Sequence, residues 1–168
     1  LNIKIKQREG FRPFAPSVLM EDCSSFFDLD TPSPYMLLIA DVVPDRREQL
    51  PEGYHDLPLF EKLYHPRSDV QSITHLDFSA RIQTVHRETN PSYHALISKF
   101  KEKTGYGLVV NTSFNVRGEP IVCTPEDSFR CFMGTEMDIL VIGNCLFVKE
   151  QQPEWDNKEK WKRTLHLD

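Results

Sequence analysis

The sequence lacks several features that would assign it at once to a class of protein. No apolar run approaches the roughly 18 residues that a membrane-spanning helix needs. Lys and Arg together number 20 and Asp and Glu 25, so the formal net charge is −5 rather than positive. A general nucleic-acid or membrane-surface binder would carry a basic excess. We therefore expect no nucleic acid and no membrane among the partners of this chain.

Paired cysteines and the common phosphate-binding motif are also missing. The four cysteines, Cys23, Cys123, Cys131 and Cys145, include no C-x-x-C pair, which disfavours a structural zinc site. Cys123, Cys131 and Cys145 lie in apolar or strand-like surroundings, so we expect buried free thiols, which fit a reducing cytoplasm. The chain contains no G-x-x-x-x-G-K-[ST] run, so it has no P-loop.

Two segments carry the spacing and end signals of helices. Residues 90–105 predict a helix, because Asn90 can cap its start and Gly105 can end it. A second helix is predicted over residues 124–134, where a Pro and two acids follow the capping position. The apolar residues of the first helix have the spacing of one buried face, namely Tyr93, Leu96, Ile97 and Phe100.

Strand-like segments alternate with these helices. Ile3 and Ile5 alternate with lysines, which predicts a short N-terminal strand. The apolar run 35–43 predicts a strand covered on both faces. Further strands are expected within 71–85, 107–110 and 138–148, the last as a hairpin that turns at Gly143 and Asn144. Residues 44–70, with four prolines, predict an irregular insertion or mobile loop. The fold class is therefore α/β or α+β with a mixed sheet.

The N-terminal segment is the first candidate site. It carries Lys4, Lys6, Arg8 and Arg12 against one acid, Glu9. Phosphates and carboxylates bind at such local positive charge, because Arg offers a planar fork and Lys a mobile point charge. A solvated edge strand would account for the same pattern, since lysines protect sheet edges against aggregation.

A polar run after the predicted strand 107–110 is the second candidate. It reads Asn-Thr-Ser-Phe-Asn-Val-Arg-Gly over residues 111–118. Ligands of α/β sheets bind beyond the carboxyl ends of strands, where hydroxyl and amide side chains can donate to phosphoryl oxygens. A Ser- and Asn-rich turn explains the run equally well. His75 and Asp77 form a third, weaker candidate that could ligate a metal, although a structural histidine is the commoner case.

Four ordered strings of this sequence resemble the C-terminal domain of the NodU/CmcH-type carbamoyltransferases. They are Lys-Gln-Arg-Glu-Gly-Phe-Arg-Pro-Phe-Ala-Pro-Ser at 6–17, Ser-Pro-Tyr-Met at 33–36, Thr-His-Leu-Asp-Phe-Ser-Ala-Arg-Ile-Gln-Thr-Val at 74–85, and Asn-Thr-Ser-Phe-Asn-Val-Arg-Gly-Glu-Pro-Ile-Val at 111–122. They stand in the order of the family, and the likeness covers about residues 4–149.

The resemblance implies both a fold and an activity. Residues 1–150 would form a YrdC-like twisted mixed sheet flanked by helices. The residues after 150 carry little of the resemblance, and their polar and charged composition predicts a C-terminal tail over residues 151–168. On such a domain, carbamoyl phosphate and ATP, with Mg²⁺ carried by the nucleotide, would combine into a carbamoyl-adenylate. An N-terminal kinase-like domain of the same polypeptide, which binds its own metal ion, would pass the carbamoyl group to an acceptor hydroxyl. We expect that domain to be absent from this chain.

The resemblance also assigns the site residues. Catalytic roles would fall on Lys6, Arg12, Arg81 and Ser113. Lys6 and Arg12 would neutralise phosphates, Arg81 would hold the carbamoyl phosphate or the α-phosphate, and Ser113 would donate a hydrogen bond. The ATP-binding positions would be Arg8, Asn111, Asn115 and Arg117. No protein metal site is expected in this chain, and the cationic groups must converge with the Ser-Asn turn into one pocket.

Two other functions fit the same residues. The chain could be a non-catalytic nucleotide-binding module that serves a partner domain. It could also be a YrdC-like enzyme that makes threonylcarbamoyl-AMP from bicarbonate and threonine. The Asn-Thr-Ser-Phe-Asn string favours the carbamoyltransferases.

Overall fold

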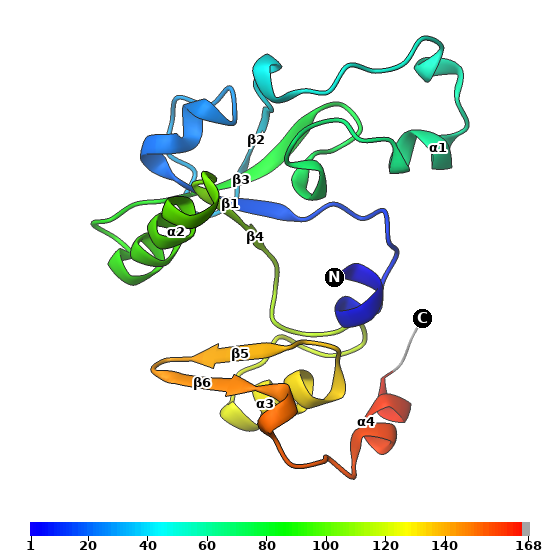
Figure 1. Cartoon of the computed structure of the whole chain (residues 1–168), viewed down its shortest axis with the longest axis vertical. Coiled ribbons are helices and arrows are strands. Elements are labelled where there is room, and N and C mark those ends of the chain that lie inside the picture. Colours follow the sequence, from blue (N-terminus) through cyan, green and yellow to red (C-terminus); the bar gives the residue numbers. More distant parts are fainter. Residues whose placement is uncertain (166–168) are drawn as a thin grey trace. The chain divides into compact units, whose positions relative to one another are not determined.

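The computed structural model describes residues 1–165, which form two compact units. Unit 1 comprises Leu1–Arg12 and the described chain from Ser113 onward, and unit 2 comprises Pro13–Thr112 (Figure 1). Each contains helices and strands, so the predicted α+β class with a mixed sheet is confirmed.

Unit 2 is built on a four-stranded mixed sheet in the order β2-β3-β1-β4. Its strands are β1 (Ala15–Leu19), β2 (Leu38–Asp41), β3 (Ser79–Val85) and β4 (Leu108–Asn111). β1 pairs in parallel with β3 and antiparallel with β4, and β2 pairs antiparallel with β3. The strands predicted within 71–85 and 107–110 are therefore confirmed.

The central strand β1 contains a proline. Proline has no N–H for a ladder and is normally confined to strand ends and edges. The ladder between β1 and β3 begins only at Ser17, opposite Gln83, so Pro16 lies outside that ladder. Val18 and Leu19 continue the strand and are 0% and 2% exposed. This strand is not among those predicted from the sequence.

The two faces of this sheet pack against different groups. Val18 and Ile82 point to the larger core, which contains several phenylalanines. Leu19 and Val85 point to the opposite face, where they pack on Ile97 of α2 (Pro91–Thr104). Side chains alternate between the two faces along each strand, which produces this division. On the face that packs on α2, the strand positions two residues before Leu19 and Val85 carry polar side chains. Figure 1 shows α2 beside the sheet.

Helix α2 begins and ends where the sequence predicts. Asn90 Oδ1 accepts a hydrogen bond from the Tyr93 N–H at 3.3 Å, and Gly105 ends the helix at a φ of 84°, which favours glycine. With 14 residues α2 is the longest described helix. Within residues 1–165, no helix combines the length and the apolar character that crossing a membrane requires.

The buried face of α2 is narrower than predicted. Ile97 is fully buried, but Leu96 is 62% and Phe100 41% exposed, so the prediction was wrong at these two positions. His94 takes part of the buried face instead, and its Nε2 lies 2.8 Å from Glu21 Oε1. A polar pair therefore replaces apolar packing on one side of the helix.

The predicted double-sided burial of residues 35–43 is also wrong. Only Leu38–Asp41 form a strand, and it lies at the edge of the sheet. Tyr35 and Leu37 are each 80% exposed and Ile39 62%. An edge strand has one neighbour, so its apolar side chains are not enclosed by the sheet and its helices as those of a central strand are.

Residues 44–70 follow the irregular path that their prolines predict. They contain the 3₁₀ turns Pro44–Arg46 and Tyr54–Asp56 and the short helix α1 (Leu59–Tyr64). One buried cation organises the end of the segment, since Arg67 is only 4% exposed. Its guanidinium donates to five backbone carbonyls, those of Lys62, Leu63, His65, Thr74 and His75.

Unit 1 begins with a turn and not with the predicted strand. Asn2–Lys6 form a π-helical turn, which ends at Gln7 in the left-handed conformation with a φ of 52°. After a loop the unit continues with α3 (Pro125–Gly134), the hairpin β5 (Ile139–Ile142) and β6 (Cys145–Val148), and α4 (Lys158–Thr164). The predicted second helix and the hairpin that turns at Gly143 are confirmed.

Both ends of α3 are fixed by side chains. The Thr124 hydroxyl accepts from the Asp127 N–H, and the Asp127 carboxylate accepts from the Thr124 N–H, each at 3.1 Å, which is a capping box. At the other end a Cβ on Gly134 would lie 2.1 Å from the Trp161 ring of α4. Trp161 packs with Cys131 in the core of the unit, so residues after 151 contribute to that core.

The cysteines differ from the prediction in part. Cys131 is buried in unit 1 as expected, but Cys123 and Cys145 are exposed. Cys123 lies in the loop before the cap of α3, and Cys145 begins β6, where the hairpin residues are mostly exposed. Cys23 is buried in the core of unit 2.

Alkylation rates test these positions. Burial raises the pKa of Cys23 and of Cys131 to about 11, and only the thiolate is nucleophilic. At pH 8 we expect Cys123 and Cys145 to react with iodoacetamide at least about tenfold faster than the buried pair, as measured by peptide mass spectrometry. The urea-denatured chain is the control, in which all rates should be similar. Fast labelling of Cys131 in the folded chain would contradict its burial.

Candidate functional site

Six of the eight predicted site residues gather in unit 1. Together with Glu9 and Val116 they line one cavity of about 370 Å³, and they are Lys6, Arg8, Arg12, Ser113, Asn115 and Arg117. Four of these side chains are cationic, and the cavity lining contains one carboxylate, Glu9. The predicted convergence of the N-terminal segment with the Ser-Asn turn is therefore present in this unit.

Lys6 lines the cavity and holds the turn in place. The residue is 5% exposed, and its ammonium lies 2.7 Å from the Ser113 carbonyl oxygen and 2.6 Å from that of Asn115. Asn115 Oδ1 at 2.9 Å and Ser113 Oγ at 3.3 Å complete four acceptors for three N–H donors. Burial, and after it the charge of Arg8, lowers the pKa of Lys6.

The side chain of Asn2 fixes the course of the N-terminal segment. It is 7% exposed, and its Nδ2 donates to the Arg12 carbonyl at 2.7 Å and to that of Gly10 at 3.3 Å. Its Oδ1 accepts from Arg8 Nε at 2.8 Å. The amide thus ties the π-helical turn to the residues that follow it and sets the direction of the Arg8 guanidinium.

Glu9 lies between two arginines of the cavity. Its carboxylate is 3.0 Å from Arg12 Nη2 and 3.5 Å from Arg117 Nη1. A hydrogen bond from its own backbone N–H and the charges of Arg12, Arg117 and Arg8 lower the pKa of Glu9, against the opposing effect of burial. We did not predict Glu9 as a site residue, although it is the one acid among the N-terminal cations.

The loop that follows β4 is organised by its own side chains. Ser113 Oγ donates to Asn115 Oδ1 at 2.6 Å, and Asn115 Nδ2 donates to the Glu119 carbonyl at 2.8 Å. The Arg117 N–H donates to the Lys6 carbonyl at 3.1 Å. Val116, at 1% exposed, anchors the loop in the core of the unit. The polar atoms are therefore held in position before any ligand binds.

The other two predicted site residues, Arg81 and Asn111, belong to unit 2. Arg81 and Gln83 follow each other on the same face of β3, by the alternation of strand residues. Asn111 Nδ2 donates to Gln83 Oε1 at 2.6 Å, and Ser17 Oγ donates to the same oxygen at 2.6 Å. Arg81 and Asn111 thus share a polar part of one sheet face. Their convergence with the cationic segment remains a prediction.

The third candidate, around His75, is a turn that precedes β3. Asp77 Oδ1 accepts from the Ser79 hydroxyl at 2.7 Å and from the Ser79 N–H at 3.0 Å, and these bonds lower the pKa of Asp77. His75 Nδ1 lies 3.0 Å from the same hydroxyl. Over residues 1–165 there is no group of three or more His, Cys, Asp and Glu side chains that could hold a metal ion.

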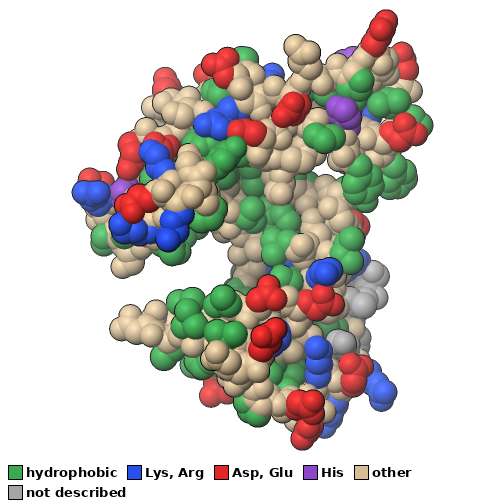
Figure 2. Space-filling model, viewed as in Figure 1, with side chains coloured by type: hydrophobic (Ala, Val, Ile, Leu, Met, Phe, Trp, Pro, Cys, Tyr) green, Lys and Arg blue, Asp and Glu red, His purple; other side chains and the backbone are tan. Residues whose placement is uncertain are grey.

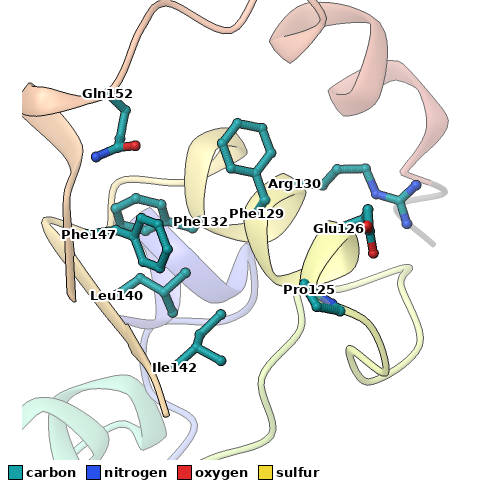
Figure 3. Close-up of a pocket in the computed structure, with 9 residues that line it drawn as sticks. All are labelled: Pro125, Glu126, Phe129, Arg130, Phe132, Leu140, Ile142, Phe147 and Gln152. Carbon is teal, nitrogen blue, oxygen red and sulfur yellow. The ribbon is translucent and has the colours of Figure 1, made fainter. Parts of the chain in front are cut away.

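A second cavity of unit 1, of about 490 Å³, is apolar. Figure 3 shows the rings of Phe132 and Phe147 close to Leu140, whereas the guanidinium of Arg130 points away from them. Hydrophobic side chains also gather over the β5–β6 hairpin in Figure 2, where Leu146 is 64% exposed. This lining is mostly apolar and its one arginine pairs with Asp127, so the cationic cavity is the candidate for anion binding.

Replacing Lys6 tests how much the site depends on it. Lys6→Met would remove the ammonium that donates to the Ser113 and Asn115 carbonyls, and we expect the free energy of unfolding to fall by about 2–4 kcal/mol. Lys4→Met is the matched control, because Lys4 lies in the same turn with its side chain 74% exposed. It should change the free energy by less than about 0.5 kcal/mol. Equal effects in urea denaturation would contradict the role of Lys6.

Comparison with known proteins places these motifs in a family. The family model described as Carbamoyltransferase C-terminus matches residues 1–149. The chain is 56% identical over 168 residues to protein sll1178 of Synechocystis sp., a match that covers all of this chain and 27% of that protein. It is 37% identical over 163 residues to nodulation protein NolNO of Sinorhizobium fredii, covering 97% of this chain and 21% of NolNO.

An O-carbamoyltransferase is among the relatives as well. The chain is 32% identical over 148 residues to the 3'-hydroxymethylcephem-O-carbamoyltransferase of Amycolatopsis lactamdurans, covering 88% of this chain and 24% of the enzyme. It spans about a quarter of the length of these curated relatives. The family match includes both the cationic segment and the turn that Lys6 joins to it, and the chain belongs to the carbamoyltransferase C-terminal family.

Proposed function

We propose that the cationic cavity of unit 1 binds the phosphates of ATP and carbamoyl phosphate, and that the chain forms a carbamoyl-adenylate. One observation carries this proposal. In a chain of net charge −5, four cationic side chains converge with a serine and an asparagine around one cavity. Family membership supports a carbamoyltransferase-related role, and the cavity supplies the chemistry for its phosphorylated substrates.

The cations would act in two different ways. Arg12 and Arg117 have side chains 53% and 37% exposed, so their planar forks can reach a phosphate directly. Lys6 directs its three donors to Ser113 and Asn115. It would therefore act on the ligand through the turn that it holds and through its charge.

The proposed reaction requires such fixed positive charge. A carbamoyl oxygen becomes bonded to the α-phosphorus of ATP, the bond from the α-phosphorus to the bridging oxygen breaks, and pyrophosphate leaves. The carbamoyl oxygen comes from carbamoyl phosphate, whose bond between oxygen and phosphorus is first cleaved by water, so that inorganic phosphate leaves and carbamate remains as the attacking group. Negative charge moves onto the departing groups, and cations placed beforehand lower the barrier. Mg²⁺ would arrive with the nucleotide and be held by its phosphates and water.

Two further parts of the proposal concern unit 2 and the partner domain. Arg81 is exposed on the polar part of its sheet face, where its guanidinium would hold carbamoyl phosphate, with Asn111 beside Gln83 framing the ligand. A domain of the same polypeptide, such as the additional length of the relatives provides, would transfer the carbamoyl group to an acceptor hydroxyl.

Removing one guanidinium tests the cavity as a phosphate site. Arg12→Ala should weaken the binding of ATP by about tenfold, because it removes charge-assisted hydrogen bonds. Arg130→Ala is the control, since it deletes the same charge from a side chain that pairs with Asp127 outside the cavity. Isothermal titration calorimetry measures both. Equal losses in the two variants would contradict a phosphate site at Arg12.

Exchange of labelled pyrophosphate into ATP tests the reaction itself. We expect exchange that depends on carbamoyl phosphate, in a preparation that includes the segments found in the longer relatives. Binding without exchange would indicate a non-catalytic nucleotide-binding module. Exchange that depends on bicarbonate and threonine would indicate synthesis of threonylcarbamoyl-AMP. Either result would overturn the proposed reaction.

A further inference from the structure

The cationic cavity already contains an anion of its own. The Glu9 carboxylate faces Arg12 with one oxygen and Arg117 with the other, at 3.0 and 3.5 Å. A carboxylate and a phosphate present the same kind of oxygen pair to a guanidinium. Glu9 therefore occupies a position that suits a phosphate of the ligand.

The contacts of Glu9 with the two arginines are weak enough for a ligand to replace them. Its Oε2 is buried, yet within the described residues it has no aligned hydrogen-bond partner, although Arg12 Nη2 is 3.0 Å away. The side chains of this trio are between 36% and 53% exposed, and ion pairs at such exposure are weak. A ligand could displace this carboxylate at small cost.

We infer that Glu9 is an internal counter-ion that competes with the ligand phosphate for Arg12 and Arg117. The inference rests on the proposed function, because it deepens the description of the same cavity. In the ligand-free protein Glu9 holds the two guanidiniums close together, ready to bind a phosphate, and offsets the repulsion between their charges. When a phosphate enters, the carboxylate gives way and both arginines turn to the ligand.

Glu9 belongs to the same chain segment as Arg12, and this covalent link strengthens its competition with the ligand. A group attached close to its partners competes as if at a millimolar concentration, even where each contact is weak. The penalty applies equally to every incoming anion. Only a ligand with more charge than a single carboxylate, such as a pyrophosphate or triphosphate group, then binds well in spite of it.

Inorganic pyrophosphate is the probe for this inference. Glu9→Gln keeps the size of the side chain and removes its charge, so pyrophosphate affinity should rise about fivefold in isothermal titration calorimetry. Glu136→Gln is the matched control, since Glu136 is an exposed carboxylate of the same unit, 3.8 Å from Lys4. It changes the net charge equally, and the affinity should change less than about twofold.

The possible results separate this inference from the proposed function. Unchanged or weaker binding by Glu9→Gln, when wild type binds pyrophosphate, overturns the role of Glu9 and leaves the phosphate site standing. Equal gains in both variants also overturn it, because they show only a general effect of charge. If neither wild type nor Glu9→Gln binds pyrophosphate, the phosphate site and the inference both fail.

A second substitution guards against a change in folding. Glu9→Asp keeps the charge and shortens the side chain by one methylene, which withdraws the carboxylate from the arginines. Its pyrophosphate affinity should lie between those of wild type and Glu9→Gln. An affinity below wild type would overturn the inference, and circular dichroism establishes that each variant is folded.

Discussion

One buried ammonium group joins the two segments of the candidate site. Lys6 and the turn it holds are more than a hundred residues apart in sequence, and its donors connect the N-terminal turn to the carbonyls of Ser113 and Asn115. Burial of an ammonium is unfavourable unless its donors are satisfied, and here four acceptors surround it. With the turn fixed in this way, Arg8, Arg12 and Arg117 line one cavity.

The parts of the fold that local signals determine could be predicted from the sequence. Asn90 and Gly105 set the ends of α2, Thr124 starts α3, and Gly143 turns the hairpin. The parts set by neighbours distant in sequence could not. The central strand β1 could not be predicted because it contains Pro16, and a proline is accepted there only because the ladder with β3 begins at the next residue. The apolar run at β2 gives no sign that the strand has a neighbour on one side only.

The site residues could be predicted better than their environment. Six of eight lie around one cavity, but the predicted strand would have placed Lys4 and Lys6 on the same face. The π-helical turn separates them, so that Lys4 has a side chain 74% exposed and Lys6 is 5% exposed. Glu9 was missed because an acid among cations suggests surface pairing. Gln83 was missed because only the folded sheet connects it to Asn111.

The central claim is that this cavity is the anion site of the chain, and NMR titration with inorganic pyrophosphate tests it most directly. Signals of the arginine Nε–H groups and of the backbone amides can be followed residue by residue. We expect saturable shifts at Arg8, Arg12 and Arg117 and at the amides of residues 113–117, which line or border the cavity. Shifts confined to unit 2, or to the apolar lining around Phe132, would contradict the account.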